Sequence, residues 1–508
     1  MTRLTAADSW FLYLETPTVH LHVTGVVLLD PSTAPDGLTF GRLQEHISER
    51  LHMIPMFRRR LIEVPFGIDH PVWIEDPDFH LGEHVHHHVL DATDAGAEAD
   101  REFADFVGTF CSQQLDRARP LWDMVYVEGL AQGRTALVTK LHHALVDGVT
   151  GVDIMAHLLD TSPEPGPLTP EDPPWRSDPV PSPTRAAVDA SANRIRTPLR
   201  PVRAVWRTLA STARMTGATV RSRLGPGERA AGAFNAPRTP FNSTLTARRS
   251  VAFGATSLSD VKATRRAFSV TVNDVVLSAC TFGLRRQLER NGTVPDRPLT
   301  CSVPVSVHGK VSGSTNQVSS MFVYLPVDEA DPVEQLRRVH TSAGSAKAVQ
   351  DAMAPEMIGD VVDLIPPPLF HLGADLWSRV GLPDRLPPVH NLIISNVPGS
   401  PIPLYIAGAQ LVALYPFGPL MEGTALNVTV LSNLDDLDVG LISCPDLVPD
   451  LDHLLRDIIE GFDTLHRLGL EAADRAPDGN PEPEPDAEPP VDLTTRTPAR
   501  PRPRKGRP

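Results

Sequence analysis

The sequence predicts an α/β protein built from two domains. Its 508 residues exceed what a single hydrophobic core usually serves. Strand-like and helix-like segments alternate over 1–160 and again over 245–470, which is typical of mixed α/β domains. Between them, 161–190 is rich in Pro, Glu, Asp and Ser and too poor in apolar residues to form a core. We therefore expect an N-terminal domain, a connector over 161–244, a C-terminal domain and a tail over 471–508.

The first region has clear patterns of both kinds. Strands are predicted at 21–29, 121–130 and 134–141, and helices at 40–51 and 149–159. The second and third strands form a hairpin, because a short turn containing glycine joins them. The hairpin runs directly into the segment HHALVDG at 142–148. This segment is therefore expected in a loop at the end of a central strand, a common place for functional residues.

The connector ends in a basic stretch over 191–224. Eight arginines between Arg194 and Arg223 are interleaved there with apolar residues such as Trp206 and Leu209. A basic amphipathic helix of this kind can lie on an anionic membrane. It can equally be a solvated helix packed on its own protein, and the sequence leaves both interpretations open.

The second region repeats the mixed pattern. Strands are predicted at 249–253, 299–307, 319–327, 391–397, 425–431 and 437–442, and helices at 257–267, 272–288 and 448–468. The tail that follows is acidic and proline-rich and then basic and proline-rich, so we expect it to be disordered.

Charge, cysteine usage and hydropathy exclude several classes. A net charge of −15 argues against a nucleic-acid-binding protein. The four cysteines form no CxxC pair, which argues against a disulfide scaffold or zinc ribbon and suits a reducing cytoplasm. No secretory signal is expected at the N-terminus, and no window has the ~18 consecutive apolar residues of a membrane helix. We expect a cytoplasmic protein that meets lipid, if at all, at a membrane face or lipid droplet.

The strongest chemical signal is the pair His142-His143, followed by Asp147 and Gly148. A histidine can remove a hydroxyl proton near neutral pH as an acyl group leaves a thioester. The aspartate and the glycine can fix the local backbone. A metal site is the first alternative, but no spacing such as HExxH supports it. A structural histidine at a strand end is the second alternative. We favour His143 as a general base, with no metal.

With this heptad the chain resembles the bacterial wax ester synthase/diacylglycerol acyltransferase family, whose mark is HHxxxDG, and in particular its actinobacterial triacylglycerol synthases. Further elements occur in the same order over residues 4–470. They are Leu4-Thr5-Ala6-Ala7-Asp8 with Phe11, His22-Val23, Pro120-Leu121-Trp122, Asn273-Asp274, Pro304-Val305-Ser306, Asn316-Gln317-Val318 and Ser395-Asn396-Val397-Pro398-Gly399. HHxxxDG alone also occurs in other CoA-dependent acyltransferases and in condensation domains, so the ordered set is the more specific sign.

The resemblance implies two chloramphenicol-acetyltransferase-like domains with a substrate tunnel between them. It implies an O-acyltransferase that moves a long-chain acyl group from acyl-CoA to diacylglycerol or to a long-chain alcohol, with acyl-CoA as substrate and no cofactor. His143 would be the base, His142 a supporting residue, and Asp147 a structural residue paired with an arginine. Two alternatives stay open: a non-catalytic acyl-CoA or lipid-binding protein, and a condensation enzyme that uses carrier-protein thioesters.

Other residues are assigned to the site by the same resemblance. Asn273 is the expected oxyanion donor, because its amide N–H donates without changing charge. Its alternative role is an N-cap for a helix that begins at Val275. Asp274 is expected to be structural or to line the substrate site.

The remaining motif residues each have a packing alternative. Pro120, Leu121 and Trp122 are expected to shape the acyl channel or simply to pack in the core. Ser395 and Asn396 are expected to line the site or to form a turn. One departure from the family pattern is His308, which stands where arginine is common and puts a CoA contact there in doubt.

Overall fold

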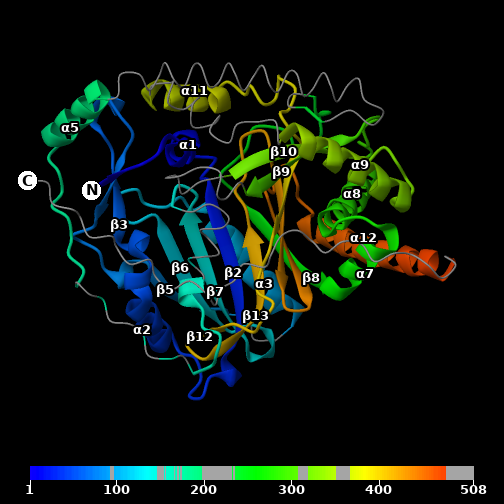
Figure 1. Cartoon of the computed structure of the whole chain (residues 1–508), viewed down its shortest axis with the longest axis horizontal. Helices are drawn as coiled ribbons and strands as arrows, with labels where there is room; N and C mark the ends of the chain where they lie inside the picture. The colour runs from blue at the N-terminus through cyan, green and yellow to red at the C-terminus, as the bar shows by residue number, and fades with distance from the viewer. Residues whose placement is uncertain are drawn as a thin grey trace, which may run out of the picture.

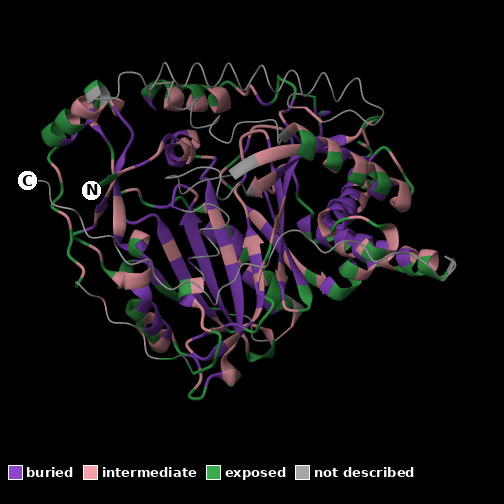
Figure 2. Cartoon of the chain, in the orientation of Figure 1, coloured by how far each residue is buried: buried purple, intermediate pink, exposed green. Residues whose placement is uncertain are grey.

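The computed structural model places two β-sheets side by side, with helices on their outer faces (Figure 1). The structure describes all residues except 92–95, 146–153, 155, 165, 167, 169–170, 172–173, 197–230, 233–234, 307–317, 351–366 and 476–508. The strands of both sheets are mostly buried, whereas exposed residues concentrate on the surrounding helices (Figure 2).

The first sheet has six strands in the order β12-β13-β2-β7-β6-β5. They are β12 (Tyr405–Ile406), β13 (Ala409–Phe417), β2 (His22–Asp30), β7 (Thr135–His142), β6 (Trp122–Glu128) and β5 (Val85–Val89). All neighbours are antiparallel except β5 and β6, which are parallel. The predicted strand at 21–29 and the predicted hairpin are confirmed as β2, β6 and β7. Every residue of β7 is buried, so this strand is central in the fold as well as in the sheet order.

Several N-terminal elements pack on one face of this sheet. They are α1 (Ala6–Leu14), α2 (Phe40–Arg50) and a small sheet of β1 (Thr2–Arg3), β4 (Val72–Glu75) and β3 (Arg59–Ile62), in the order β1-β4-β3. The α1 helix begins where the Thr5 hydroxyl accepts a hydrogen bond from the Asp8 N–H. Leu12 and Tyr13 of α1 then enter a core shared with Leu43 and Trp122. Helix α1 was not predicted, and it proves central to the site.

The second sheet also has six strands, in the order β10-β9-β11-β14-β15-β8. They are β10 (Val318–Leu325), β9 (Leu299–Ser306), β11 (Leu392–Val397), β14 (Leu426–Asn433), β15 (Asp436–Ser443) and β8 (Ser250–Ser257). The associated helices are α7 (Leu258–Phe268), α8 (Val272–Arg290), α9 (Pro332–Gln350) and α12 (Leu451–Arg475). All six predicted strands of this region are present. The α12 helix continues to Arg475, past the start expected for the tail, because its apolar face packs on α7 and α8.

One strand crosses between the two halves. Strand β13 comes from the C-terminal region but pairs with β2 of the first sheet, and it also packs against β14 and β15. The close approach requires Gly440, since a Cβ there would lie 2.2 Å from the Pro416 carbonyl oxygen. Strands β12 and β13, from within 245–470, therefore complete the sheet of the N-terminal half. Strand pairing across hundreds of residues has no local sequence signal.

The remaining described elements are helices and 3-10 turns outside the sheets. They are α3 (Ala97–Ser112), α5 (Pro183–Arg196), α11 (Pro367–Arg379) and the 3-10 turns η1 (Pro31–Thr33), η2 (Leu51–Met53), η3 (Pro55–Arg58), η4 (Pro65–Gly67), η5 (Leu81–Glu83) and η6 (Ala131–Gly133). Most of the basic stretch, 197–224, lies outside the described residues. In the described part of the chain no single helix has the length and apolar character to cross a membrane, and only the bent pair α7–α8 meets those criteria together.

Candidate active site

The two histidines of the heptad sit at the end of β7 but differ in their surroundings. His142 is the last residue of the strand, opposite His22 on β2, and only 1% of its side chain is exposed. His143 begins the turn that follows, where its N–H donates to the Leu21 carbonyl. His143 as a residue is only partly buried. Of the pair, His143 is therefore the less enclosed.

Both ring nitrogens of His142 face protein groups. Its Nδ1 accepts a hydrogen bond from the Ala144 N–H at 3.0 Å, and its Nε2 lies 3.5 Å from Oε2 of Glu15. A nitrogen that accepts from an N–H carries no proton of its own. The ring proton of neutral His142 is therefore on Nε2 and points to the carboxylate. These contacts are compatible with the supporting role expected for His142, which stays a prediction.

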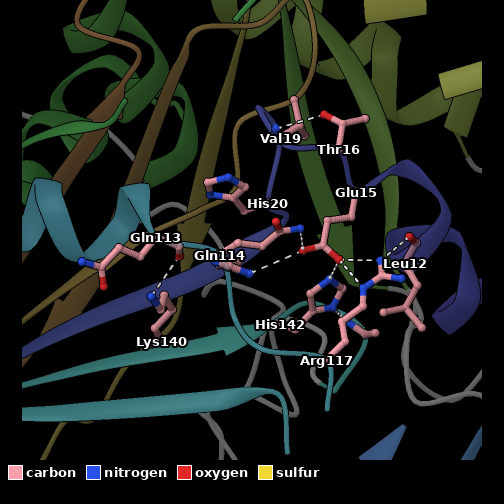
Figure 3. Close-up of polar contacts among 12 residues, drawn as sticks. Leu12, Glu15, Thr16, Val19, His20, Gln113, Gln114, Arg117, Lys140 and His142 are labelled. Carbon is pink, nitrogen blue, oxygen red and sulfur yellow. Dashed lines mark hydrogen bonds and ion pairs between the residues drawn. The ribbon is translucent and has the colours of Figure 1, made fainter. Parts of the chain in front are cut away.

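Glu15 is the centre of a buried charged cluster (Figure 3). Its carboxylate accepts from Gln114 Nε2 at 2.7 Å and from Arg117 Nε and Nη2 at 2.9 and 2.5 Å. Burial by itself would raise the pKa of Glu15, but the His142 contact, the Arg117 charge and the Gln114 bond outweigh it and lower the pKa to about 2. Glu15 is therefore ionised at any physiological pH.

The partners of Glu15 are held by the end of α3. Buried Lys140, on β7, donates from Nζ to the carbonyls of Phe110 and Gln113 at 2.9 and 3.0 Å. A cation at the carbonyl end of a helix is favourable, although burial lowers the pKa of Lys140. Lys140 thus fixes the point from which Gln114 and Arg117 reach Glu15 (Figure 3).

Helix α1 contacts His143 as well. The Phe11 ring stacks on the His143 ring, with centroids 3.9 Å apart and an angle of 12° between planes. Glu15, on the same helix, is its C-cap residue. Stacking against a ring held in a packed helix restricts the orientation of the imidazole.

Two more histidines continue the row behind the site. His22 and His20 are buried, with ring centroids 5.7 Å from His142 to His22 and 5.5 Å from His22 to His20. Burial first, and then the neighbouring His142 ring and the charge of Lys140, keep the pKa of His22 well below its ordinary value. Burial also lowers the pKa of His20. These rings are neutral at physiological pH, which leaves Arg117 as the cation bonded to the Glu15 carboxylate.

The other residues predicted for the N-terminal half have different fates. Asp147 and Gly148 lie outside the described residues, so their roles stay predictions. Pro120, Leu121 and Trp122 are all buried. The Trp122 ring stacks between Phe57 and His84, and its Nε1 donates to the Phe57 carbonyl at 2.8 Å. These contacts are those of the core-packing alternative.

Asn273 and Asp274 lie in the first turn of α8. The N-cap is Thr271, which exchanges two hydrogen bonds with Asp274 in a capping box, so the alternative role of Asn273 as N-cap is wrong. Helix α8 begins at Val272, where the predicted helix 272–288 also begins, and the capping box satisfies its first N–H groups. Asp274 is buried and also bonds His340 at 2.8 Å, as expected of a structural residue. The oxyanion role of Asn273 stays a prediction.

Ser395 and Asn396 belong to β11 and pair with β14, so they are not part of a turn. The chain turns only after Val397. Gly399 is needed there because a Cβ would lie 1.9 Å from the Ser432 carbonyl oxygen. A role of Ser395 and Asn396 at the substrate site stays a prediction, and His308 lies outside the described residues.

Sequence reasoning missed Glu15, Arg117, Lys140 and the part that Phe11 plays. Glu15 follows an apolar helix and precedes a strand, and a carboxylate in such a position is a weak sign of a buried pair. Its main partner Arg117 is 102 residues away, so no spacing pattern connects them.

A two-sheet α/β fold with an exchanged strand and a histidine turn at the end of β7 defines the class: an acyltransferase with chloramphenicol-acetyltransferase-like halves. Comparison with solved structures agrees. The wax ester synthase/diacylglycerol acyltransferase from Marinobacter aquaeolei VT8 matches with a TM-score of 0.64 and 29% identity, over 93% of this chain and 100% of that one. The starter condensation domain of rhizomide synthetase has the same fold, with a TM-score of 0.52 and 10% identity over 93% and 95% of the two chains.

The chain belongs to the wax ester synthase/diacylglycerol acyltransferase family. The family's catalytic-domain model matches residues 4–276, and its C-terminal-domain model matches residues 314–466. A candidate diacylglycerol O-acyltransferase of Mycobacterium tuberculosis is 34% identical over 94% of this chain and 92% of its own length. A second one from that organism is 32% identical over 87% and 92%. The chain is therefore an acyltransferase enzyme, and the non-catalytic alternative is set aside.

Proposed function

We propose that the protein transfers a long-chain acyl group from acyl-CoA to the hydroxyl of diacylglycerol, with His143 as general base. The observation that carries this proposal is the different burial of the two histidines at the end of β7. His142 is enclosed between Glu15 and the Ala144 N–H, whereas His143 as a residue is only partly buried. A base must reach the proton that it removes, and the lesser burial of His143 supports its choice over His142.

A single imidazole can perform both proton transfers of this reaction. His143 takes the proton of the acceptor hydroxyl while its oxygen attacks the thioester carbonyl. The tetrahedral intermediate then expels the CoA thiolate, which receives that proton from the imidazolium. The oxyanion needs a fixed donor, and Asn273 is the residue we propose for it. The balance is closed by acyl-CoA and alcohol alone, so we propose that no metal or other cofactor takes part.

The names of the relatives favour diacylglycerol over a fatty alcohol as acceptor. The two Mycobacterium tuberculosis relatives are named for diacylglycerol, whereas the Marinobacter protein is named for both activities. A competition assay with palmitoyl-CoA, dioleoylglycerol and hexadecanol in one mixture measures the preference. We expect mainly triacylglycerol, and a wax ester as the main product would reverse this assignment.

The base is tested by substitution. His143→Ala should lower kcat by about 10²- to 10⁴-fold, the usual contribution of general-base catalysis. His87→Ala is the matched control, because His87 is exposed and bonds only Glu128 among the contacts described for its ring nitrogens. Full turnover by His143→Ala would overturn the proposal, as would loss of activity in a chelator that excess Mg²⁺ or Zn²⁺ restores.

We also propose that the protein meets a lipid surface through helix α11. Leu369, Leu372 and Leu376 recur at helical spacing, and each is more than half exposed. The other side of α11 packs on α1, where Phe370 lies 5.1 Å from the Trp10 ring. Phe66, in the adjacent η4 turn, is 90% exposed. Helix α11 packs on α1, which contacts His142 and His143. This apolar face is therefore near the proposed site, which suits substrates that partition into lipid.

Vesicle flotation tests this contact. A Leu372→Asp/Leu376→Asp variant should lose binding to vesicles of phosphatidylglycerol and phosphatidylcholine. Leu470→Asp is the control, since Leu470 is an equally exposed leucine on α12. Equal flotation of the double variant and the wild type would contradict the proposal.

A further inference from the structure

One helix contacts both histidines of the heptad, each through a different residue. Phe11 and Glu15 are four residues apart, so they lie on the same side of α1. Phe11 stacks on His143 at 3.9 Å, and the Glu15 carboxylate lies 3.5 Å from His142. Helix α1 therefore packs against the proposed base, His143, and its C-cap carboxylate faces the ring of His142.

The contacts of Glu15 form a continuous series that ends at the backbone next to His143. Arg117 bonds Glu15, Glu15 faces Nε2 of His142, and Nδ1 of His142 accepts from Ala144. The turn is closed by two further bonds, from the His143 N–H to Leu21 and from the Leu145 N–H to the His142 carbonyl. The residues on both sides of His143 are thus held by the ring of His142.

Helix α1 itself is anchored at both ends. The Thr5–Asp8 cap holds its start, and Arg117 donates to the Leu12 carbonyl near its end. The Tyr13 hydroxyl bonds Nδ1 of buried His70 at 2.7 Å. A rigid helix can impose an orientation on the groups that it contacts, whereas a mobile one cannot.

We propose that Glu15 is a positioning residue for catalysis: it orients His142, with the ring proton on Nε2, and so fixes the turn that presents His143. Phe11 completes the arrangement by setting the plane of the His143 ring. This inference rests on the proposed role of His143 as base. It assigns to Glu15 an effect on kcat that a purely structural ion pair with Arg117 would not have.

The direct test is Glu15→Gln, which preserves size but removes the charge. We expect kcat with palmitoyl-CoA and dioleoylglycerol to fall by about 10- to 100-fold, the range expected for a misplaced catalytic group, with each KM changed less than threefold. Glu63→Gln is the matched control, because Glu63 bonds the same Arg117 at 3.0 Å but is exposed and remote from His142. A kcat within twofold of wild type in folded Glu15→Gln would overturn the proposal.

Coupling through His142 is tested by a double variant. In His142→Asn the shorter side chain can still accept from Ala144 through its amide oxygen but no longer reaches Glu15. If Glu15 acts through His142, Glu15→Gln costs at least tenfold in the wild-type background and less than threefold in the His142→Asn background. Equal costs in the two backgrounds would show that Glu15 acts by another route and would overturn the proposal.

A measurement on the wild-type protein covers the case in which Glu15→Gln does not fold. Nitrogen-15 NMR of labelled histidine, with the His142 signals identified by their loss in His142→Asn, should show a protonated Nε2 and an unprotonated Nδ1 at neutral pH. The opposite tautomer would overturn the proposal. Failure of the base assignment is separate, because it appears as activity retained by His143→Ala.

Discussion

Two buried carboxylates, one in each half of the molecule, have pKa values shifted in opposite directions. Glu15 lies beside the active-site turn, and contacts with His142, Arg117 and Gln114 lower its pKa to about 2 in spite of burial. Asp438 lies on β15, where the two sheets meet, and burial raises its pKa to about 7. Both side chains are almost fully enclosed.

The difference lies in the partners. Asp438 accepts from the Leu414 backbone N–H of β13 at 2.8 Å and has an amide neighbour in Asn433, but it has no cation among its described contacts. Glu15 has the guanidinium of Arg117. Burial favours the neutral acid, and at Glu15 the contacts with His142, Arg117 and Gln114 together reverse this preference. Glu15 therefore keeps its charge beside the His142-His143 turn, whereas Asp438, at the junction of the sheets, is mainly neutral below about pH 7.

The largest expected effect on stability comes from removing Arg117, the cation of the Glu15 cluster. Arg117→Met should lower the free energy of unfolding at pH 7 by about 3 to 5 kcal/mol, because it leaves a buried carboxylate without its cation. Chemical denaturation measures this. Arg119→Met is the matched control, since Arg119 pairs with Glu83 on the surface and should cost less than about 1 kcal/mol. Equal losses in the two variants would remove the distinction between the two environments.

The next effect is the dependence of stability on pH that the ionisation of Glu15 causes. Its folded pKa of about 2 lies below the ordinary value of 4.5, so its ionisation stabilises the fold above pH 4.5, and this contribution is lost as the pH falls through 2. Relative to Glu15→Gln, wild type should be more stable by about 2 to 3 kcal/mol at pH 7. The advantage should shrink below pH 4.5 in denaturation curves recorded from pH 7 to pH 3. A difference independent of pH would contradict the assigned pKa.

Asp438 should show the opposite slope. Its folded pKa of about 7 lies above the ordinary value of 3.8, so the folded state binds the extra proton between these values and stability falls as the pH rises from 4 to 7. Between pH 5 and pH 8, wild type should lose about 2 kcal/mol relative to Asp438→Asn. Denaturation curves recorded from pH 5 to pH 8 measure it, and parallel pH profiles of the two proteins would show that Asp438 ionises normally.

The smallest effect is expected at a third carboxylate, Asp274. Its partner His340 is 51% exposed, so solvent screens the pair. His340→Ala should therefore change the free energy of unfolding by less than about 1 kcal/mol. Thr271→Ala, which removes the cap on the same residue, should cost about 1 kcal/mol. A loss above 2 kcal/mol in His340→Ala would show that this pair contributes to stability like the buried Glu15 cluster.

The local parts of the fold were predictable from sequence. The hairpin of β6 and β7 was predicted from two apolar runs around a glycine turn, and its exit into His142 and His143 placed the site at a strand end. The start of α8 at Val272 was predicted, but its cap was not, because Thr271 and not Asn273 caps it. Strand β13 was missed because its pairing with β2 joins residues more than 370 positions apart.

The sequence by itself determined the class of chemistry, because HHALVDG and the ordered motifs around it are local patterns that can be read directly. Only the tertiary structure decided which histidine is sealed and which is presented. That choice depends on Glu15, Arg117 and Phe11, which α1 and the segment after α3 bring together. Burial and long-range pairing set the protonation of these groups, and both are properties of the folded chain.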